Sequence, residues 1–345
     1  MPRSVAAAVA FLSYGVLFAA ISTPSYSDLM RTMSSFQESR MLLTAVELDV
    51  FTAVGGGASA SQIAASLKTS PRATESFLNA LVAMGALTKR DGIFHNTAAT
   101  ARYLAAGSPD YARPALMHTV HMWKAWSTLT ESVRAGTAVA QPGVDAEDEQ
   151  WTQSFIAAMH RNAGTAAPAL VRAVGANGIR RMLDVGGGSG AYSIAFAKAN
   201  PTLRAEVLDL RAVVPIAQKH IDEAGLTGRV VTRVGDLTKD DFGRDYDLIL
   251  LSAICHMLSP SENQDLFRRC HRALAPGGRI VIRDFILEPD RTAPRSAALF
   301  AVHMLVNTRG GSTYSEDEYR TWLKSAGFRE VTRLVPAGDL ITASR

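Results

Sequence analysis

The stretch RMLDVGGGSGAYS, residues 181–193, joins an apolar segment to a glycine-rich turn and decides how the rest of the chain is interpreted. Two patterns fit this turn. Gly186, Gly188 and Ala191 match G-x-G-x-x-G/A, which binds the pyrophosphate of a dinucleotide. The pattern D-x-G-x-G-x-G, from Asp184 to Gly190, instead suits a ligand without a pyrophosphate. The residues outside the turn must separate these interpretations.

From residue 178 onward, short apolar segments alternate with helical ones, which predicts a parallel sheet covered by helices. The expected strands are residues 181–186, 205–210, 230–236, 246–254 and 278–285. Residues 330–335 and 340–345, separated by the short turn PAGD, predict a closing antiparallel hairpin. The expected fold class is therefore α/β, with a Rossmann-like sheet and an antiparallel hairpin at its edge.

The N-terminal part has a different pattern. Residues 27–47 carry apolar side chains at helical spacing, and residues 59–97 predict two short helices and a hairpin, which is typical of a winged helix. Ser61 is the expected cap of the first short helix, and Ser70-Pro71 is expected to cap the second, with Pro at its first position. Asp91-Gly92 is the expected hairpin turn.

Winged helices often bind DNA, and Arg72, Lys89 and Arg90 are the basic residues available for it here. However, the second helix, ATESFLNALVAMGAL, is mostly apolar and offers few groups that read base edges or phosphates. We therefore expect a dimerisation domain and no nucleic-acid partner.

Residues 111–137 predict a helix dense in Met, His and Trp, and another helix begins near Trp151 after the linker AQPGVDAEDEQ. Such side chains usually pack in a core. Phe155 and Met159, one turn apart on one face, are nevertheless candidates for the wall of a pocket that holds a flat apolar ligand. The expected domains are residues 23–110 (winged helix), 111–175 (helical connection) and 176–345 (sheet).

The composition is that of an ordinary globular protein. The chain has 345 residues, of which 47% are hydrophobic and 20% charged, with a net charge of +4. Two cysteines fit a reducing compartment rather than a disulfide scaffold. Cys255-His256 and Cys270-His271 lack the spacing of a metal site, so no metal is expected.

Residues 1–22 form an apolar leader of uncertain role. A signal peptide, a short membrane anchor and a start assigned too far upstream all remain open for it. A cytoplasmic location is favoured, and membrane contact through residues 1–22 is not.

Several later features separate the two interpretations of the glycine turn. Asp209 lies about 20 residues after the glycines, where an acid accepts ribose hydroxyls of either ligand type. Asp236 follows the third strand, where a carboxylate accepts the exocyclic amine of adenine. A Pro-Gly-Gly turn precedes the fifth strand, and the closing hairpin departs from an all-parallel dinucleotide fold. In this order the features resemble class I S-adenosylmethionine (SAM)-dependent methyltransferases, so SAM rather than NAD(P) is the expected cofactor.

A winged helix before such a sheet resembles the plant-type small-molecule O-methyltransferases, which include caffeate and acetylserotonin (hydroxyindole) methyltransferases. The resemblance covers residues 27–345 and rests on the motifs SRMLLTAVELDVF, LDVGGGSG, GDL, AICHMLS, ALAPGGRIVIRDFIL and MLVNTRGGSTYSEDEY. It implies methyl transfer to a hydroxyl of a small aromatic acceptor. It also implies a homodimer in which the N-terminal helices of one chain help to close the partner's site.

The resemblance also implies the catalytic residues. His256, in AICHMLS, matches the catalytic histidine of the family and would act as general base on the hydroxyl. Asp284 stands where the family carries a carboxylate that orients this histidine. A second family acid maps to Thr313, which cannot carry charge, so the pairing of histidine with acid is expected to be weaker.

The remaining site residues follow from the same match. The expected cofactor contacts are Asp184, Gly186, Gly188, Asp209, Leu210 by the ribose, Asp236, Leu237 by the adenine, and Ser252, which replaces a lysine of plant members. The expected substrate contacts are Phe155, Met159, Met304, Asn307 and Thr308.

Three other functions stay open. The acceptor could be a nitrogen or a carotenoid or polyketide hydroxyl, because the fold does not choose it. A winged-helix regulator that binds SAM without turnover would need a basic face. An NADP-dependent reductase would need a Tyr-Lys or similar hydride-site pair, and none is convincing in the sequence.

Overall fold

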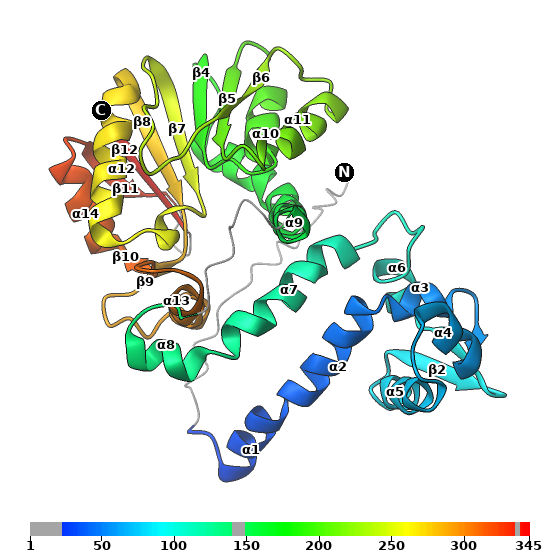
Figure 1. Ribbon diagram of the computed structural model, residues 1–345. Coiled ribbons are helices and arrows are strands. Elements are labelled where there is room, and N and C mark those ends of the chain that lie inside the picture. Colours follow the sequence, from blue (N-terminus) through cyan, green and yellow to red (C-terminus); the bar gives the residue numbers. More distant parts are fainter. Residues whose placement is uncertain (1–22, 140–148, 335–338) are drawn as a thin grey trace, which may run out of the picture.

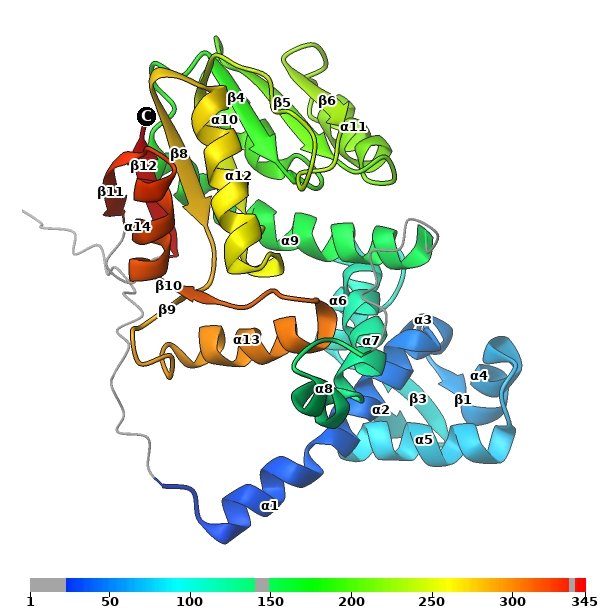
Figure 2. The ribbon, with the colours of Figure 1, turned by 60° about the vertical axis from the view of Figure 1, so that its left-hand side comes forward.

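The computed structural model describes residues 23–139, 149–334 and 339–345. The leader, part of the 140–150 linker and most of the PAGD turn lie outside these residues. The N-terminal unit contains α1 (Tyr26–Ser34), α2 (Phe36–Glu47), β1 (Ala58–Ser59) and β2 (Leu87–Arg90), with α3 (Val50–Val54), α4 (Ala60–Leu67), α5 (Pro71–Ala83), β3 (Ile93–Asn96) and α6 (Ala98–Tyr103). Figures 1 and 2 show this unit to one side of the large sheet, with α1 projecting from it.

The winged helix is present: α3, α4 and α5 pack on a three-stranded sheet of order β1-β3-β2. Ser70 occupies the N-cap position of α5 with Pro71 at its start, but its side chain makes no capping hydrogen bond. Asp91 and Gly92 have the positive φ of a tight hairpin turn. The expectation that Ser61 caps the first short helix was wrong. Ser59 is the cap, because Gln62 lies three residues after it and completes a capping box.

Three helices connect this unit to the sheet: α7 (Arg113–Trp126), α8 (Leu129–Ala135) and α9 (Glu149–Val174). The single helices expected over 27–47 and 111–137 are each divided in two, at Ser35 and at residues 127–128. Helix α7 packs against both α2 and α9, and α9 packs against α10 (Ala191–Ala199) beside the glycine turn.

The large sheet has the order β11-β12-β8-β7-β4-β5-β6. Its strands are β4 (Arg181–Val185), β5 (Arg204–Asp209), β6 (Val230–Val234), β7 (Tyr246–Ser252), β8 (Leu274–Arg283), β11 (Arg329–Arg333) and β12 (Leu340–Ser344). Strands β4 to β8 are parallel, whereas β12 pairs antiparallel with both β8 and β11. The hairpin of β11 and β12 is the one that the sequence predicted.

Helices cover both faces of this sheet (Figure 1). One cluster joins β-strand residues such as Leu251 to α12 (Pro260–Ala273) and α14 (Glu316–Ser325); the other joins residues such as Leu250 to α9, α10 and α11 (Val214–Glu223). Successive strand residues point to opposite faces, and both faces are buried, which explains the nearly continuous apolar run of β7.

The order of the strands reverses at β4: β5 and β6 lie on one side of it, and β7 and β8 lie on the other. Ligands of such sheets bind at this switch point, beyond the carboxyl ends of the strands. The 3₁₀ turn η1 (Cys255–Met257), β9 (Ile286–Leu287), α13 (Arg295–Asn307) and β10 (Tyr314–Ser315) lie beyond this edge (Figure 2). None of the helices in the described ranges is long and apolar enough to cross a membrane.

The glycine turn packs closely against the side chains of Asp184 and Val207. Gly186 and Gly188 have φ of 67° and 58°, and a Cβ atom on Gly187 would lie 2.8 Å from Cγ of Asp184 and 2.8 Å from Cγ1 of Val207. Asp184 is fully buried, and its Oδ2 accepts a hydrogen bond of 2.8 Å from the Ser193 hydroxyl. Its Oδ1 is buried without a partner in the described structure, and burial raises the pKa of this carboxyl to about 7.

The lack of space at Gly187 gives a first prediction. Gly187→Ala should lower the free energy of unfolding by about 1–3 kcal/mol, because the added methyl must displace Asp184 or Val207. Gly164 is the matched control: it lies inside α9 with a normal helical φ, and an added Cβ would have no atom within 4 Å. Gly164→Ala should stabilise by about 0.5–1 kcal/mol. Urea unfolding of both variants measures this, and equal effects would contradict the packing argument.

The pKa of Asp184 gives a second prediction. Between about pH 4 and about pH 7 the folded chain keeps this proton and the unfolded chain releases it. Raising the pH through this window therefore destabilises the wild-type chain, by about 1.4 kcal/mol per pH unit for one such group. Asp184→Asn cannot ionise, so its stability relative to wild type should grow across the window and level off above pH 7. Urea titrations at several pH values test this, and parallel curves would count against a buried neutral carboxyl.

Candidate active site

His256 and Asp284 come from neighbouring strands. His256 lies in η1, four residues after the end of β7, and Asp284 directly follows β8. The two strands are parallel with Ser252 opposite Arg283, so their carboxyl ends finish side by side. The amide of Ala253 donates to the carbonyl of Arg283 at 2.8 Å and fixes this register at the last residues. The fold therefore brings together two side chains that are 28 positions apart.

The pair is buried and closely bonded. Nδ1 of His256 lies 2.6 Å from Oδ1 of Asp284, and the two side chains are 7% and 0% exposed. The amides of His256 and Phe285 also donate to this carboxylate, at 3.1 and 2.8 Å. A carboxylate only accepts hydrogen bonds, so Nδ1 carries the proton and the neutral ring presents a lone pair at Nε2. That is the tautomer a general base needs.

Thr313, which stands where the family has a second acid, does not contribute to this pair. It is fully buried, and its hydroxyl donates to the carbonyl of Ala297 in α13 at 3.1 Å. It therefore anchors α13 rather than orienting the imidazole.

Aromatic rings surround the imidazole. The ring of Phe300, on α13, meets His256 edge-on with centroids 4.8 Å apart, and Phe285 lies at 5.9 Å. Phe285 and Phe300 stack on each other at 3.8 Å. This apolar wall excludes water from one side of His256 and leaves a surface that suits a flat ring.

The expected cofactor residues lie along the carboxyl ends of β4 to β7. Asp209 accepts hydrogen bonds from the amides of Gly188 and Leu210, both at 2.7 Å. Burial raises the pKa of Asp209, and these two bonds oppose the rise. Two carboxylate oxygens offer about four acceptor positions, so this side chain keeps room for two hydroxyl donors. That donor requirement fits the ribose of a nucleoside.

The next strand contributes Asp236 and Leu237. Partial burial raises the pKa of Asp236, but hydrogen bonds from Thr238 and the ion pair with Lys239 at 3.1 Å outweigh it and keep the pKa below its usual value. Leu237 packs beside Gly186, and the space next to Gly188 is open, with only Ile156 within 4 Å of an added Cβ. An ionised acid, an apolar side chain and an open turn fit the nucleoside expected from the sequence.

Two expected cofactor residues, Ser252 and Asp184, lie against other parts of the protein. Ser252 lies near the side chain of Tyr192, at the start of α10. The Asp184 carboxyl lies beneath the backbone of the turn. Contact of either side chain with a cofactor stays a prediction.

The expected substrate residues come from α9 and α13. Phe155 stacks on Trp151 with centroids 5.1 Å apart, and Met304 is 4% exposed. The side-chain amide of Asn307 donates to the carbonyl of His303 at 2.8 Å, and the hydroxyl of Thr308 donates to the carbonyl of Met304 at 2.8 Å. Both polar groups are thus used at the end of α13, and their contact with a substrate, like that of Phe155, Met159 and Met304, stays a prediction.

Sequence reasoning missed a cluster of histidines near this wall. His118, on α7, meets Phe155 edge-on at 5.2 Å, and burial lowers the pKa of His118 to about 4, with His303 and then His121 adding to the effect. Burial, followed by the nearby His256, also lowers the pKa of His303. The density of His and Trp in residues 111–137 was the available signal, but it is equally typical of core packing.

Helix α9 also contacts the glycine turn. Nδ1 of His160 lies 2.8 Å from the hydroxyl of Ser189, and the ring of His160 stacks on that of His220 at 3.9 Å. One helix therefore carries both Phe155, an expected substrate contact that stacks on Trp151, and a histidine that contacts the turn.

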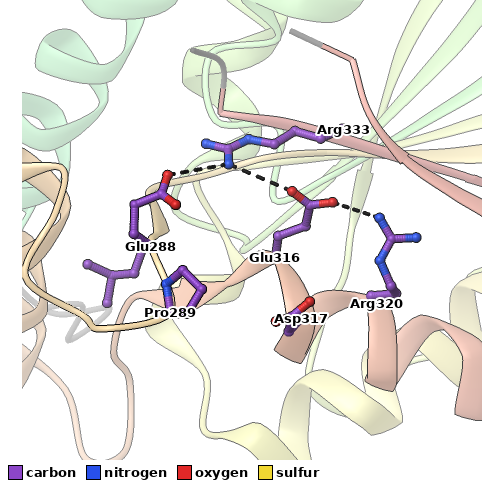
Figure 3. Close-up of a pocket in the computed structure, with 7 residues that line it drawn as sticks. Glu288, Pro289, Glu316, Asp317, Arg320 and Arg333 are labelled. Atoms are coloured by element: carbon purple, nitrogen blue, oxygen red, sulfur yellow. Dashed lines mark hydrogen bonds and ion pairs between the residues drawn. The ribbon is translucent and has the colours of Figure 1, made fainter. Parts of the chain in front are cut away.

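A separate hollow lies between β9, α14 and β11 and is lined by charged residues (Figure 3). Arg333 lies 3.8 Å from Glu288 and 3.7 Å from Glu316, which also binds Arg320 at 2.6 Å. These charges pair with each other and hold α14 against the hairpin. Among the residues with described placement, no group of three or more His, Cys, Asp or Glu is arranged to hold a metal ion.

Comparisons with known proteins identify the family of the chain. The model of the O-methyltransferase domain matches residues 126–329, and that of the O-methyltransferase dimerisation domain matches residues 30–106. The 3-hydroxy-5-methyl-1-naphthoate 3-O-methyltransferase of Streptomyces sahachiroi is 35% identical over 301 residues, covering 85% of this chain and 87% of that protein. The tetracenomycin polyketide synthesis 8-O-methyl transferase TcmO of Streptomyces glaucescens is 30% identical over 327 residues, covering 92% and 96%.

A solved structure gives the same result. Human N-acetylserotonin methyltransferase in complex with SAM has a TM-score of 0.78 and 26% sequence identity, covering 94% of this chain and 99% of that one. The chain therefore belongs to the O-methyltransferase family, with a dimerisation domain followed by a SAM-dependent methyltransferase domain.

Proposed function

We propose that this O-methyltransferase transfers a methyl group to a hydroxyl of a small aromatic acceptor, with His256 as general base. The observation that carries the proposal is the buried His256–Asp284 pair, whose free Nε2 lies beside the aromatic wall of Phe285 and Phe300. The name of the relative from Streptomyces sahachiroi, which specifies a hydroxynaphthoate, supports an acceptor of this class.

The turn at residues 186–190 would hold SAM with Asp209 at the ribose and Asp236 and Leu237 near the adenine. Bound SAM supplies an electrophilic methyl group on a sulfonium. Everything else in the reaction depends on presenting a nucleophilic oxygen in line with that methyl group. Positioning of this kind contributes up to about 7–11 kcal/mol to catalysis.

His256 provides the proton acceptor. A phenol has a pKa near 10 and is mostly protonated at neutral pH, so removal of its proton strengthens the nucleophile. Nε2 accepts that proton, and the charge that develops on the ring is stabilised by Asp284 at 2.6 Å. Because Thr313 replaces the second acid, Asp284 alone provides this stabilisation.

The proposal includes a homodimer formed through the first two helices. Large apolar side chains there are between 38% and 78% exposed in the isolated chain: Tyr26, Leu29, Met30, Met33, Phe36, Leu42 and Leu48. Exposed apolar side chains gathered on one element are typical of an interface. The match of residues 30–106 to a dimerisation domain supports a second copy of this chain as the occupant. We also propose that the enzyme acts in the cytoplasm, where SAM is made.

The proposed base is tested by separating turnover from cofactor binding. His256→Ala should reduce kcat by about 10²–10⁴-fold while the affinity for S-adenosylhomocysteine (SAH), measured by calorimetry, changes little. Asp209→Ala should do the reverse and weaken SAH by at least about tenfold. Retained turnover in His256→Ala would make this histidine structural, and unchanged SAH affinity in Asp209→Ala would remove its cofactor role.

The proposed dimer is tested by sedimentation. Met33→Glu with Phe36→Glu should convert a dimer to a monomer, because each carboxylate would be buried against apolar side chains. Val231→Glu is the control, since Val231 is 46% exposed but lies on β6, away from α1 (Figure 1). A dimer that persists in the double variant, or a wild-type monomer at micromolar concentration, would exclude this interface.

A further inference from the structure

His303 has a defined tautomer because of Trp126. The indole Nε1 of Trp126 lies 3.1 Å from Nδ1 of His303. An indole N–H can only donate, so Nδ1 of His303 must carry the lone pair. The proton of the neutral ring is therefore on Nε2. The side-chain amide of Asn307, 3.1 Å from the same Nδ1, is a second neighbour that this arrangement accommodates as a donor.

The charged form of His303 is disfavoured for the same reason. Protonation at Nδ1 would place an N–H group against the indole N–H, and the partial burial of the ring and the nearby His256 act in the same direction. His303 therefore presents a neutral hydrogen-bond donor rather than a cation.

The ring that carries this donor contacts the same phenylalanine as the proposed base. The ring of Phe300 contacts both histidines, with centroids 4.8 Å from His256 and 5.2 Å from His303. In the described structure no protein atom hydrogen-bonds to Nε2 of either ring. Both Nε2 atoms are also accessible, since neither is among the buried polar atoms that lack a partner. Nδ1 of His118, by contrast, is one of those atoms. The two rings thus offer an acceptor, on His256, and a donor, on His303, that are both free to bind a ligand.

We propose that Nε2–H of His303 binds an oxygen acceptor on the substrate, and that the enzyme selects hydroxyarenes which carry a carbonyl or carboxylate oxygen near the methylated hydroxyl. The inference rests on the proposed function. The substrate hydroxyl would donate to His256 while its second oxygen accepts from His303, so the pair fixes the orientation of the ring. Trp126 is a positioning residue that acts through His303.

An analogue without the accepting oxygen would leave the N–H group of His303 unpaired, and a site of this kind therefore rejects such analogues. The test uses matched acceptors that differ in that oxygen, such as 3-hydroxy-1-naphthoate and 2-naphthol, in a set of several hydroxyarene pairs. Wild-type enzyme should favour the member with the extra oxygen in kcat/KM. His303→Phe, which keeps a flat ring without a donor, should lose about 10–100-fold in kcat/KM on that member and less than about threefold on the other.

Three further variants make the result specific. His303→Gln restores an N–H donor and should recover part of the preference. Trp126→Phe removes the indole donor, so the tautomer of His303 is no longer fixed, and it should lower the preference without changing SAH affinity. Leu299→Ala is the control, since Leu299 is on the same helix and is 46% exposed; it should leave the preference unchanged.

The outcomes are distinguishable. Equal losses on both members of each pair in His303→Phe, or no loss, would overturn the role of His303 and leave the proposed function intact. Failure of the wild-type enzyme to methylate any hydroxyarene, while it still binds SAH, would overturn the proposed function and this inference with it.

Discussion

The short hydrogen bond between His256 and Asp284 is the interaction on which the rest of the site depends. It exists because β7 and β8 end at the same level, and β8 is held there from its other side by β12, where the amide of Asp284 donates to the carbonyl of Asp339. Loss of either side chain would leave the other polar group buried and unpaired. The antiparallel hairpin at the sheet edge thus helps to position the proposed catalytic pair.

Much of this could be predicted from sequence because the signals are local. The glycine turn, the alternation of strands and helices, and Ser70-Pro71 each depend on neighbouring residues, and all are found in the structure. His256 and Asp284 could be paired from the sequence because each follows a predicted strand and matches a family motif. The wrong cap at Ser61 concerns a local signal too: two serines compete for one cap, and the one with a partner three residues later is the cap.

The histidine cluster could not be predicted for a different reason. His118 and His303 are far apart in the sequence, and only the packing of α7 against α13 brings them together. A histidine among apolar residues is ordinarily a core residue, and sequence does not reveal which of its nitrogens is used. The contact that decides it for His303 comes from Trp126, on another helix, and its meaning depends on a single N–H.

The position of α9 has a consequence for how the binding of the two substrates is coupled. Phe155 on this helix is a proposed substrate contact that packs against His118, and little more than one turn further along His160 contacts Ser189 in the glycine turn. If α9 shifts when either site fills, the shift would reach the other site through a short length of helix. Thermodynamic linkage requires the resulting change in affinity to be equal in both directions. This coupling through the protein would act in addition to the direct contact between the methyl group and the accepting oxygen.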